Sequence, residues 1–199
     1  MSVPYFFEPN ISTSDKIVAL SEQTSKHCVQ VLRMQEGDAL LLTNGQGDMY
    51  DAVLSTAHKK QAFATITKHQ HTSPHAQNIT LGISLLKNAT RLEWLFEKAT
   101  EMGVSTIVPL ITERTIHERF KTDRMEGIIQ SALLQSQQTW LPNIQPPTSF
   151  KDFVSTCTHS TKLIAHCEPS DKKAIDAISL SNQIVLLIGP EGDFTPTEI

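Results

Sequence analysis

The stretch IVLLIGPEGDF at residues 184–194 decides the fold of this chain. Its first five residues are all apolar, which is typical of a strand buried on both faces of a parallel sheet. The run ends in Gly-Pro-Glu-Gly, which places a loop just beyond the carboxyl end of that strand. Open α/β sheets bind their ligands at that edge. The stretch therefore predicts a central strand of an α/β sheet, followed by a candidate ligand loop.

The residue types in the loop suit close contact with a ligand. Gly189 and Gly192 lack a Cβ, so the backbone can approach a ligand or adopt a positive φ. Pro190 stiffens the loop, and Glu191 could hold a ribose hydroxyl, an amine or an exchangeable proton. A plain turn between a strand and a helix explains the same residues. The dinucleotide fingerprint and the P-loop are both absent, so an ordinary Rossmann enzyme is poorly supported.

Strand and helix patterns alternate from residue 79 onward, which predicts a parallel sheet covered on both faces. Strands are expected at residues 78–86, 106–112, 162–167 and 184–189. A short helix should begin at Ser149, which forms a capping box with Asp152, and another helix should cover residues 171–178. Gly103 should end the first long helix. Two sets of apolar residues mark the long helices: Leu92, Leu95, Phe96, Ala99 and Met102, then Met125, Ile128, Ile129, Ala132 and Leu133.

The N-terminal part is β-like. The loop GQGD separates two strand patterns at residues 38–44 and 49–55, which predicts a hairpin, and residues 61–69 alternate as a half-buried strand does. Residues 26–34 predict a short helix with Cys28, Val29 and Leu32 facing inward. We therefore expect a small β-barrel at residues 1–70, a polar linker at 71–78 and an α/β domain at 79–199.

Composition narrows the class of protein. The chain has 199 residues, of which 39% are hydrophobic and 19% charged, as in folded globular proteins. No apolar run is long enough to span a bilayer, and residues 1–10 do not resemble a secretory signal. The three cysteines show no paired spacing, which favours a reduced, cytoplasmic compartment. The net charge of -4 argues against a general nucleic-acid binder, so any RNA-binding surface must be local.

Several histidines lie close together in the sequence and raise the question of a metal. His69, His71 and His75 are neighbours, and two near pairs of Cys and His occur at residues 157–159 and 166–167. None of these groups has the spacing of a structural zinc site. We therefore predict no metal.

The last residues, TPTEI, predict the start of a helix. Thr195 suits the N-cap, Pro196 the first helical position, and Glu198 the third position of a capping box. One helical turn alone is unstable. We therefore expect a C-terminal part to be missing from this chain.

These residues carry a family resemblance. LLIGPEGDF followed by TPTEI resembles the signature of bacterial 16S rRNA (uridine-N3) methyltransferases of the SPOUT (trefoil-knot) superfamily. KHCVQVLRM resembles the family's His-x-x-x-Val-Leu-Arg segment, and GDALLLTNGQGDMYDAVL resembles the hairpin of its N-terminal PUA-like domain. RLEWLFEKATEMGVSTIVPLITER resembles the helix and strand that open the knot domain. The similarity covers nearly the whole chain, and EKATEMGV together with IGPEG is fairly specific.

The resemblance implies a cofactor, S-adenosyl-L-methionine, held by three loops. The residues expected to bind it here come from two of them: His166, Cys167, Glu168, Ile188, Gly189, Pro190, Glu191 and Gly192. The resemblance places the third loop and the knot-forming segment in the C-terminal part that we expect to be missing. Glu191 and Arg114 are the candidate catalytic residues, because the uridine N3 proton must leave before the nitrogen attacks. A solvent-exposed or salt-bridged Arg114 is the structural alternative.

The resemblance also implies partners. The expected substrate is 16S rRNA in the small ribosomal subunit, with Lys26, His27 and Arg33 as candidate phosphate contacts, and a solvated surface explains these three residues equally. A homodimer is expected, with no membrane partner. The sequence departs from the family near residue 135, where Leu134, Gln135, Ser136 and Gln138 lack the usual basic residue. The alternative function is a catalytically inactive rRNA-binding protein with a degenerate α/β scaffold.

Overall fold

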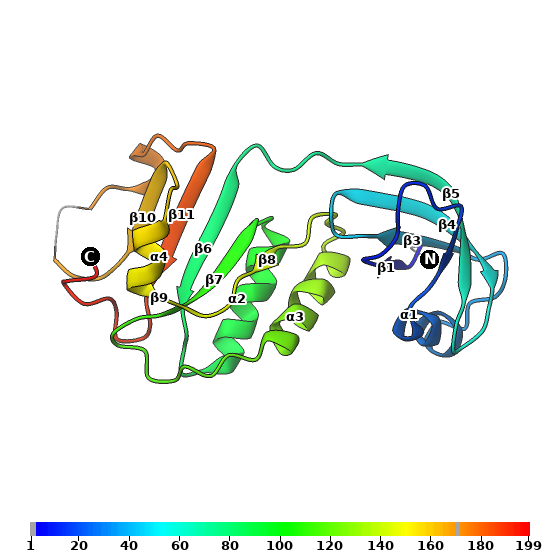
Figure 1. Ribbon diagram of the computed structural model, residues 1–199, viewed down its shortest axis with the longest axis horizontal. Coiled ribbons are helices and arrows are strands. Elements are labelled where there is room, and N and C mark those ends of the chain that lie inside the picture. The colour runs from blue at the N-terminus through cyan, green and yellow to red at the C-terminus, as the bar shows by residue number, and fades with distance from the viewer. Residues whose placement is uncertain (1–2, 170–171) are drawn as a thin grey trace. The chain divides into compact units, whose positions relative to one another are not determined.

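The computed structural model describes residues 3–169 and 172–199 (Figure 1). The chain forms two compact units. Unit 1 comprises Met1–Pro74 and Leu133–Leu141, and unit 2 comprises His75–Ala132 and Pro142–Ile199. The first change of unit falls within the polar segment 71–78, whereas Leu133–Leu141, expected in the α/β domain, belongs to unit 1.

Unit 1 is built on a five-stranded sheet in the order β1-β3-β4-β5-β2. The strands β3 and β4 form the predicted hairpin, with Leu42 opposite Tyr50, and two register shifts along β4 and β5 mark irregular pairing. Such bulges increase the local twist of a sheet. β1 pairs with β3 in parallel, and the other pairs are antiparallel. The strands are β1 (Tyr5–Phe7), β2 (Ile17–Ala19), β3 (Ala39–Thr43), β4 (Asp48–Thr56) and β5 (Phe63–His71).

The helix of unit 1 begins earlier than predicted. α1 spans Glu22–Lys26, with the side chain of Ser21 as its N-cap, and continues as a π-helix over His27–Val31. Cys28 is fully buried, as predicted. Leu32 is 44% exposed, so the inward placement predicted for it is wrong: it is the C-cap of the π-helix, and the chain turns away at Arg33, which takes a positive φ of 55°.

The segment Leu133–Leu141 joins unit 1 through its backbone. Trp140 forms a β-bridge with Gln46, and its indole Nε1–H donates to the carbonyl oxygen of Thr72 at 2.8 Å. The Gly47 N–H donates to the carbonyl oxygen of Thr139 at 2.8 Å. Through these contacts, a segment about 90 residues away in sequence packs against the turn of the β3–β4 hairpin.

Unit 2 holds a parallel sheet in the order β10-β11-β6-β7-β8, with β9 also paired to β7 (Figure 1). β11 lies between β10 and β6, which confirms the central strand predicted from IVLLI. The strands are β6 (Asn78–Ser84), β7 (Thr106–Ile111), β8 (Asn143–Ile144), β9 (Thr148–Ser149), β10 (Thr161–Ala165) and β11 (Gln183–Ile188).

The centre of this sheet is buried on both faces. Ile107 and Val108 are consecutive in β7, so their side chains point to opposite faces, yet they are 0% and 3% exposed. On one face Val108 packs in a cluster with Phe150 of α4 and with Phe194. Connecting helices supply much of this cover. They are α2 (Ala89–Glu101), α3 (Thr122–Gln135) and α4 (Phe150–Thr156).

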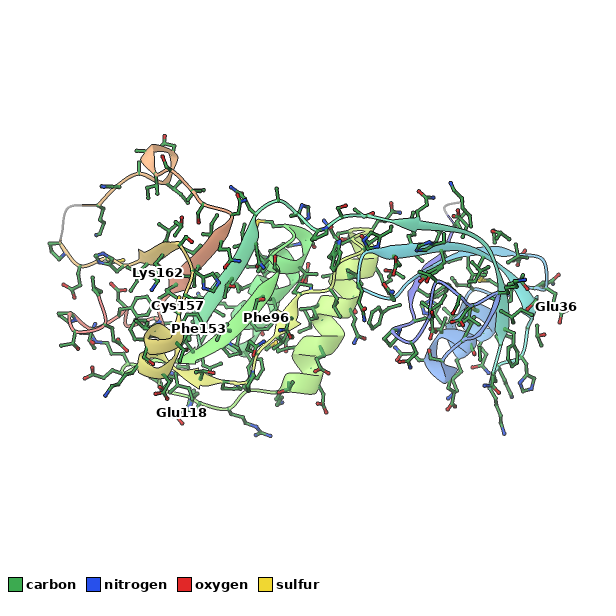
Figure 2. All side chains as sticks on the ribbon, turned by 45° about the horizontal axis from the view of Figure 1, so that its top comes forward. Glu36, Phe96, Glu118, Phe153, Cys157 and Lys162 are labelled. Carbon is green, nitrogen blue, oxygen red and sulfur yellow. The ribbon has the colours of Figure 1, made fainter. Side chains whose placement is uncertain are left out.

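The helix predictions for unit 2 are confirmed with two exceptions. Gly103 follows α2 with a φ of +78°, and the side chain of Ser149 caps α4, both as predicted. Phe96, labelled in Figure 2, is fully buried on α2, but Met102 is 74% exposed because the helix has ended there. Of the helix predicted at 171–178, residue 171 lies outside the described residues, and the rest contains only a 3₁₀ turn at Ile175–Ala177. Ile175 is 64% exposed, so its side chain adds no buried apolar contact that would stabilise a longer helix.

No helix among the described residues is long and apolar enough to cross a membrane.

Candidate functional site

Four loops leave the same edge of the sheet in unit 2. Because β10, β11, β6 and β7 are parallel neighbours, their carboxyl ends meet at that edge. The loop after β10 begins at His166, and the loop after β11 contains the Gly-Pro-Glu-Gly sequence. The loops after β6 and β7 contribute Lys87 and Arg114. The candidate cofactor and catalytic residues therefore share one edge of the sheet.

The glycines of the β11 loop have different surroundings. A Cβ on Gly189 would lie 3.1 Å from the ring of Phe194, which is fully buried and packs at a tilt against the ring of Phe150, with ring centroids 5.3 Å apart. A Cβ on Gly192 would meet only the side chain of Arg114, at 3.5 Å. Neither glycine has a positive φ, whereas Asp193 does, at 64°. The close packing of Phe194 thus explains why residue 189 is a glycine, whereas a Cβ at residue 192 would fit without a clash.

Asp193, which was not among the predicted site residues, links the β11 loop to the β10 loop. Its Oδ2 accepts a hydrogen bond from the Cys167 N–H at 2.6 Å, and its Oδ1 accepts one from the Phe194 N–H at 2.8 Å. These two bonds, followed by the nearby charges of His166 and Arg114, lower the pKa of the Asp193 carboxyl below its usual value. Asp is one of the few residues that tolerate the left-handed region, and this was the only available signal.

His166 contributes a polar atom that lacks a partner. Its Nδ1 is buried and makes no hydrogen bond with any other described residue. Cys167 is exposed and Glu168 is half-buried, and both follow directly in the chain. A buried ring nitrogen without a partner is costly unless a ligand or water pairs with it. The β10 loop therefore offers a polar atom to a ligand.

Arg114 clamps the β11 loop. Its guanidinium Nη1 donates to the carbonyl oxygens of Gly192 at 2.7 Å and of Phe194 at 3.3 Å. Its position is set by a turn in which the Thr112 N–H donates to Oγ1 of Thr115 at 2.9 Å. Arg114 is exposed, as one structural alternative expected, but carbonyl oxygens rather than a carboxylate hold its guanidinium.

Three side-chain hydroxyls form a cluster that packs against this turn. Oγ of Ser84, at the end of β6, lies 3.1 Å from Oγ1 of Thr112 and 3.0 Å from Oγ1 of Thr115. Ser84 is fully buried. Three hydroxyls that can donate and accept in turn satisfy one another in this position. The cluster fixes the loop that carries Arg114 to the end of the neighbouring strand.

Glu191 reaches a third loop. Its side chain is exposed, and Oε1 accepts a hydrogen bond from the Lys87 N–H at 3.1 Å. Pro190 is buried, and its carbonyl oxygen accepts from the Asp193 N–H at 3.0 Å, which closes the turn that presents Glu191. Through Asp193, Arg114 and Glu191, the β11 loop is thus joined to all three neighbouring loops.

One half of the capping box predicted at residues 195–198 is formed. The Thr195 N–H donates to Oε2 of Glu198 at 2.9 Å, as the third residue of a capping box should accept it. The Glu198 N–H returns to the Thr195 carbonyl oxygen at 2.9 Å, which forms a single turn. Oε1 of Glu198 also accepts from the Glu113 N–H at 3.0 Å, next to Arg114.

The candidate RNA contacts lie in unit 1 around the π-helix. Lys26 pairs with Glu22 at 2.6 Å, and His27 meets the ring of Phe6 edge-on, with centroids 5.7 Å apart. Arg33 is exposed. A π-helical turn and a positive φ at a non-glycine residue are both enriched at functional sites.

The clustered histidines of unit 1 surround a carboxylate. Oδ1 of Asp48 lies 2.9 Å from Nε2 of His69 and 2.8 Å from Nδ1 of His71, while the Asn44 amide donates to Oδ2 at 2.8 Å. Burial raises the pKa of the Asp48 carboxyl, but these hydrogen bonds outweigh it and lower the pKa to about 2. Within residues 3–169 and 172–199, no group of three or more His, Cys, Asp or Glu side chains is arranged to hold a metal ion.

Comparison with known families identifies two matching models. Residues 73–199 match an RNA methyltransferase domain, and residues 20–67 match an RNA methyltransferase PUA domain.

Individual relatives agree with these matches. The ribosomal RNA small subunit methyltransferase E of Synechocystis sp. is 31% identical over 92% of this chain and 62% of its own length. The protein of the same name from Rickettsia conorii is 26% identical over 98% of this chain and 80% of its own length. Among solved structures, ribosomal RNA small subunit methyltransferase E from Neisseria gonorrhoeae, bound to S-adenosyl methionine, superposes with a TM-score of 0.86 at 28% identity, over 99% of this chain and 84% of that one.

Proposed function

The chain belongs to the RNA methyltransferase family, with a PUA domain before the methyltransferase domain, and from this premise we propose that it methylates N3 of a uridine in small-subunit (16S) ribosomal RNA. The methyl donor is S-adenosyl-L-methionine, which supplies an electrophilic methyl group. The observation that carries the proposal is the junction of four loops at the carboxyl edge of the sheet, where every candidate cofactor and catalytic residue lies.

The proposed cofactor residues differ in which of their atoms remain available for a hydrogen bond or contact with the cofactor. Nδ1 of His166 has no described partner and is available to a polar group of the cofactor. The Cys167 N–H already donates to Asp193, so Cys167 can offer only its carbonyl oxygen and side chain. Gly189 supports the loop by leaving room for Phe194, and Gly192 leaves room for close backbone contact. Ile188, Pro190, Glu191 and Glu168 complete the proposed set.

The catalytic roles follow from charge. The uridine imide is a weak acid, so its proton must leave and the developing negative charge needs stabilisation. Glu191 is exposed with one carboxylate oxygen bonded to the Lys87 N–H, which orients the other oxygen as a proton acceptor. Arg114 lies beside Gly192, where its positive charge stabilises the deprotonated base and holds the loop at the same time.

A decisive experiment measures two quantities on the purified chain. Isothermal titration with S-adenosylmethionine tests the cofactor site, and transfer of a tritiated methyl group into small ribosomal subunits tests the reaction. Glu191→Gln should retain cofactor binding and lose most of the transfer, because only the proton acceptor changes. Loss of neither quantity in Glu191→Gln would remove Glu191 from the mechanism, and absence of both binding and transfer in the full-length protein would refute the proposed function.

The alternative is an rRNA-binding protein without activity. It is favoured by the loop contacts, because Arg114 and Asp193 occupy backbone groups of the β10 and β11 loops that a cofactor would otherwise meet. Lys26, His27 and Arg33 would then carry the whole function through rRNA phosphates. A protein that binds rRNA but shows no heat of binding with S-adenosylmethionine would support this alternative.

Two further properties belong to the proposal. The rRNA substrate places the reaction in the cytoplasm, within ribosome biogenesis. The protein is proposed to act as a homodimer, which light scattering coupled to size-exclusion chromatography would test, since a mass of one chain would contradict it.

A further inference from the structure

A cavity of about 630 Å³ lies in unit 2 next to the four-loop junction. Its walls come from the loop after β6, the start of α2, the loop between β7 and α3, and the first turn of α3. Its volume falls within the range typical of ligand sites. Neither the candidate cofactor residues nor the candidate RNA contacts line it.

One wall of the cavity is apolar. Leu85, Leu92 and Met125 are 2%, 4% and 4% exposed, so they form a packed floor. Ile116, on the loop after β7, is 68% exposed. A large aliphatic side chain exposed beside a packed apolar floor suits the face of a planar ring.

The rim of the cavity is basic. Four lining residues are Lys or Arg and two are Glu, which gives a local formal charge of +2 in a chain of -4. Arg124 and Glu93 neutralise each other through two hydrogen bonds of 3.2 Å and 2.9 Å. The other acidic residue, Glu118, is exposed on the loop after β7 (Figure 2).

Three cations therefore remain for a ligand. The side chains of Lys87, Arg119 and Lys121 are exposed and form no direct hydrogen bond or ion pair with another described residue, although the charge of Lys121 also helps to lower the pKa of Glu93. Their charge argues against S-adenosylmethionine as the occupant, because that molecule carries a sulfonium and an ammonium against one carboxylate. A polyanion is favoured instead.

The position of the cavity links it to the reaction. Lys87 lines the cavity and donates its N–H to Glu191, and Ile116 follows Arg114 by two residues. A nucleotide in the cavity would therefore lie next to both candidate catalytic side chains.

We propose that this cavity binds a nucleotide of the RNA substrate, with its base against the apolar wall and its phosphates at Lys87, Arg119 and Lys121. The inference rests on the proposed function and extends it, because it names the surface of the methyltransferase domain that receives the RNA. It gives this domain its own share of RNA affinity, separate from that of the PUA domain.

The test compares two double variants that each remove two positive charges. Arg119→Gln/Lys121→Gln changes the cavity, and Lys172→Gln/Lys173→Gln changes exposed lysines of unit 2 outside the cavity as the matched control. Binding of a fluorescein-labelled oligouridylate RNA is measured by anisotropy over a range of salt concentrations, and binding of S-adenosylmethionine by calorimetry. The cavity variant should bind RNA about tenfold more weakly, and its salt slope should be about 1.4 smaller in magnitude, at roughly 0.7 per lost phosphate contact.

A third variant tests the apolar wall without changing positive charge. Ile116→Ser should weaken RNA binding several-fold and leave the salt slope unaltered, because it removes contact with a base rather than with a phosphate. Unchanged RNA affinity in both cavity variants would overturn the proposal, as would equal losses in the cavity and control double variants. A loss confined to S-adenosylmethionine affinity would also overturn it, by assigning the cavity to the cofactor. RNA binding is read independently of methyl transfer, so failure of the proposed reaction leaves this test intact.

Discussion

The carboxylate of Asp193 accepts a hydrogen bond from the Cys167 N–H at 2.6 Å and so joins two loops that are 26 residues apart in the sequence. The same carboxylate accepts from the Phe194 N–H at 2.8 Å. Since His166 and the Gly-Pro-Glu-Gly loop lie on either side of this link, Asp193 sets the separation of the two proposed cofactor loops.

Replacement of Asp193 should therefore weaken cofactor binding more than it weakens the fold. Asp193→Ala removes both hydrogen bonds and places alanine at a φ of 64°, whereas Asp193→Asn tolerates that φ and keeps one acceptor. We expect calorimetry to rank affinity for S-adenosylmethionine as parent, then Asn, then Ala. Equal affinity in all three proteins would show that the link does not position the site.

The two loop glycines should respond in opposite ways. Gly189→Ala forces a Cβ to about 3.1 Å from the fully buried Phe194 ring, and such overpacking costs about 1–3 kcal/mol of unfolding free energy. Gly192→Val meets only Arg114, so it should leave the melting temperature within a few degrees and lower cofactor affinity. Thermal melts and calorimetry on both variants give the comparison. A stable Gly189→Ala protein would contradict the packing role.

Gly47 should be the most sensitive position of the hairpin in unit 1. Its φ is +91°, and a Cβ there would lie 2.6 Å from the Trp140 ring and 2.7 Å from the carbonyl oxygen of Thr72. Gly47→Ala should lower the unfolding free energy by about 2 kcal/mol or more, through strain and displacement of Trp140. Gly37→Ala is the control, because its φ is +96° but no atom lies within 4 Å of the added Cβ. Equal losses of unfolding free energy in the two variants would mean that backbone strain alone causes the loss and that Trp140 moves aside at little cost.

Asp48 should make unit 1 sensitive to acid. Its pKa is about 2 in the folded protein against 3.8 as a reference, so the folded state binds the proton less readily than the unfolded state. The stability it contributes is complete above pH 3.8 and is lost as the pH falls towards about 2. Urea unfolding across this window should show a steeper loss of free energy in the parent than in Asp48→Asn. Parallel curves would remove Asp48 as the cause.

Limited proteolysis should cut first within the linker at residues 71–78. These residues are exposed, and the chain passes from unit 1 to unit 2 among them. Mass spectrometry of the early fragments locates the cut. First cleavage inside β11 would contradict the boundary.

The sequence by itself determined the elements whose cause is local. The apolar run at residues 184–188 predicted the central strand, the GQGD loop predicted the hairpin, and the capping residues Ser149 and Thr195 predicted the turns that follow them. Each depends on side-chain type, on spacing along the chain, or on both. The helix predicted at residues 171–178 was largely wrong because propensity alone cannot supply the packing that holds a short helix.

Only the tertiary structure decided how the loops meet. Arg114, Lys87 and Cys167 come from three loops, and the parallel order of β10, β11, β6 and β7 brings them to one edge. The same holds for Trp140, which packs on a hairpin about 90 residues earlier. A residue's own type does not reveal whether its partner will be a carboxylate, a carbonyl oxygen or a ligand, because strand order and chain folding choose that partner.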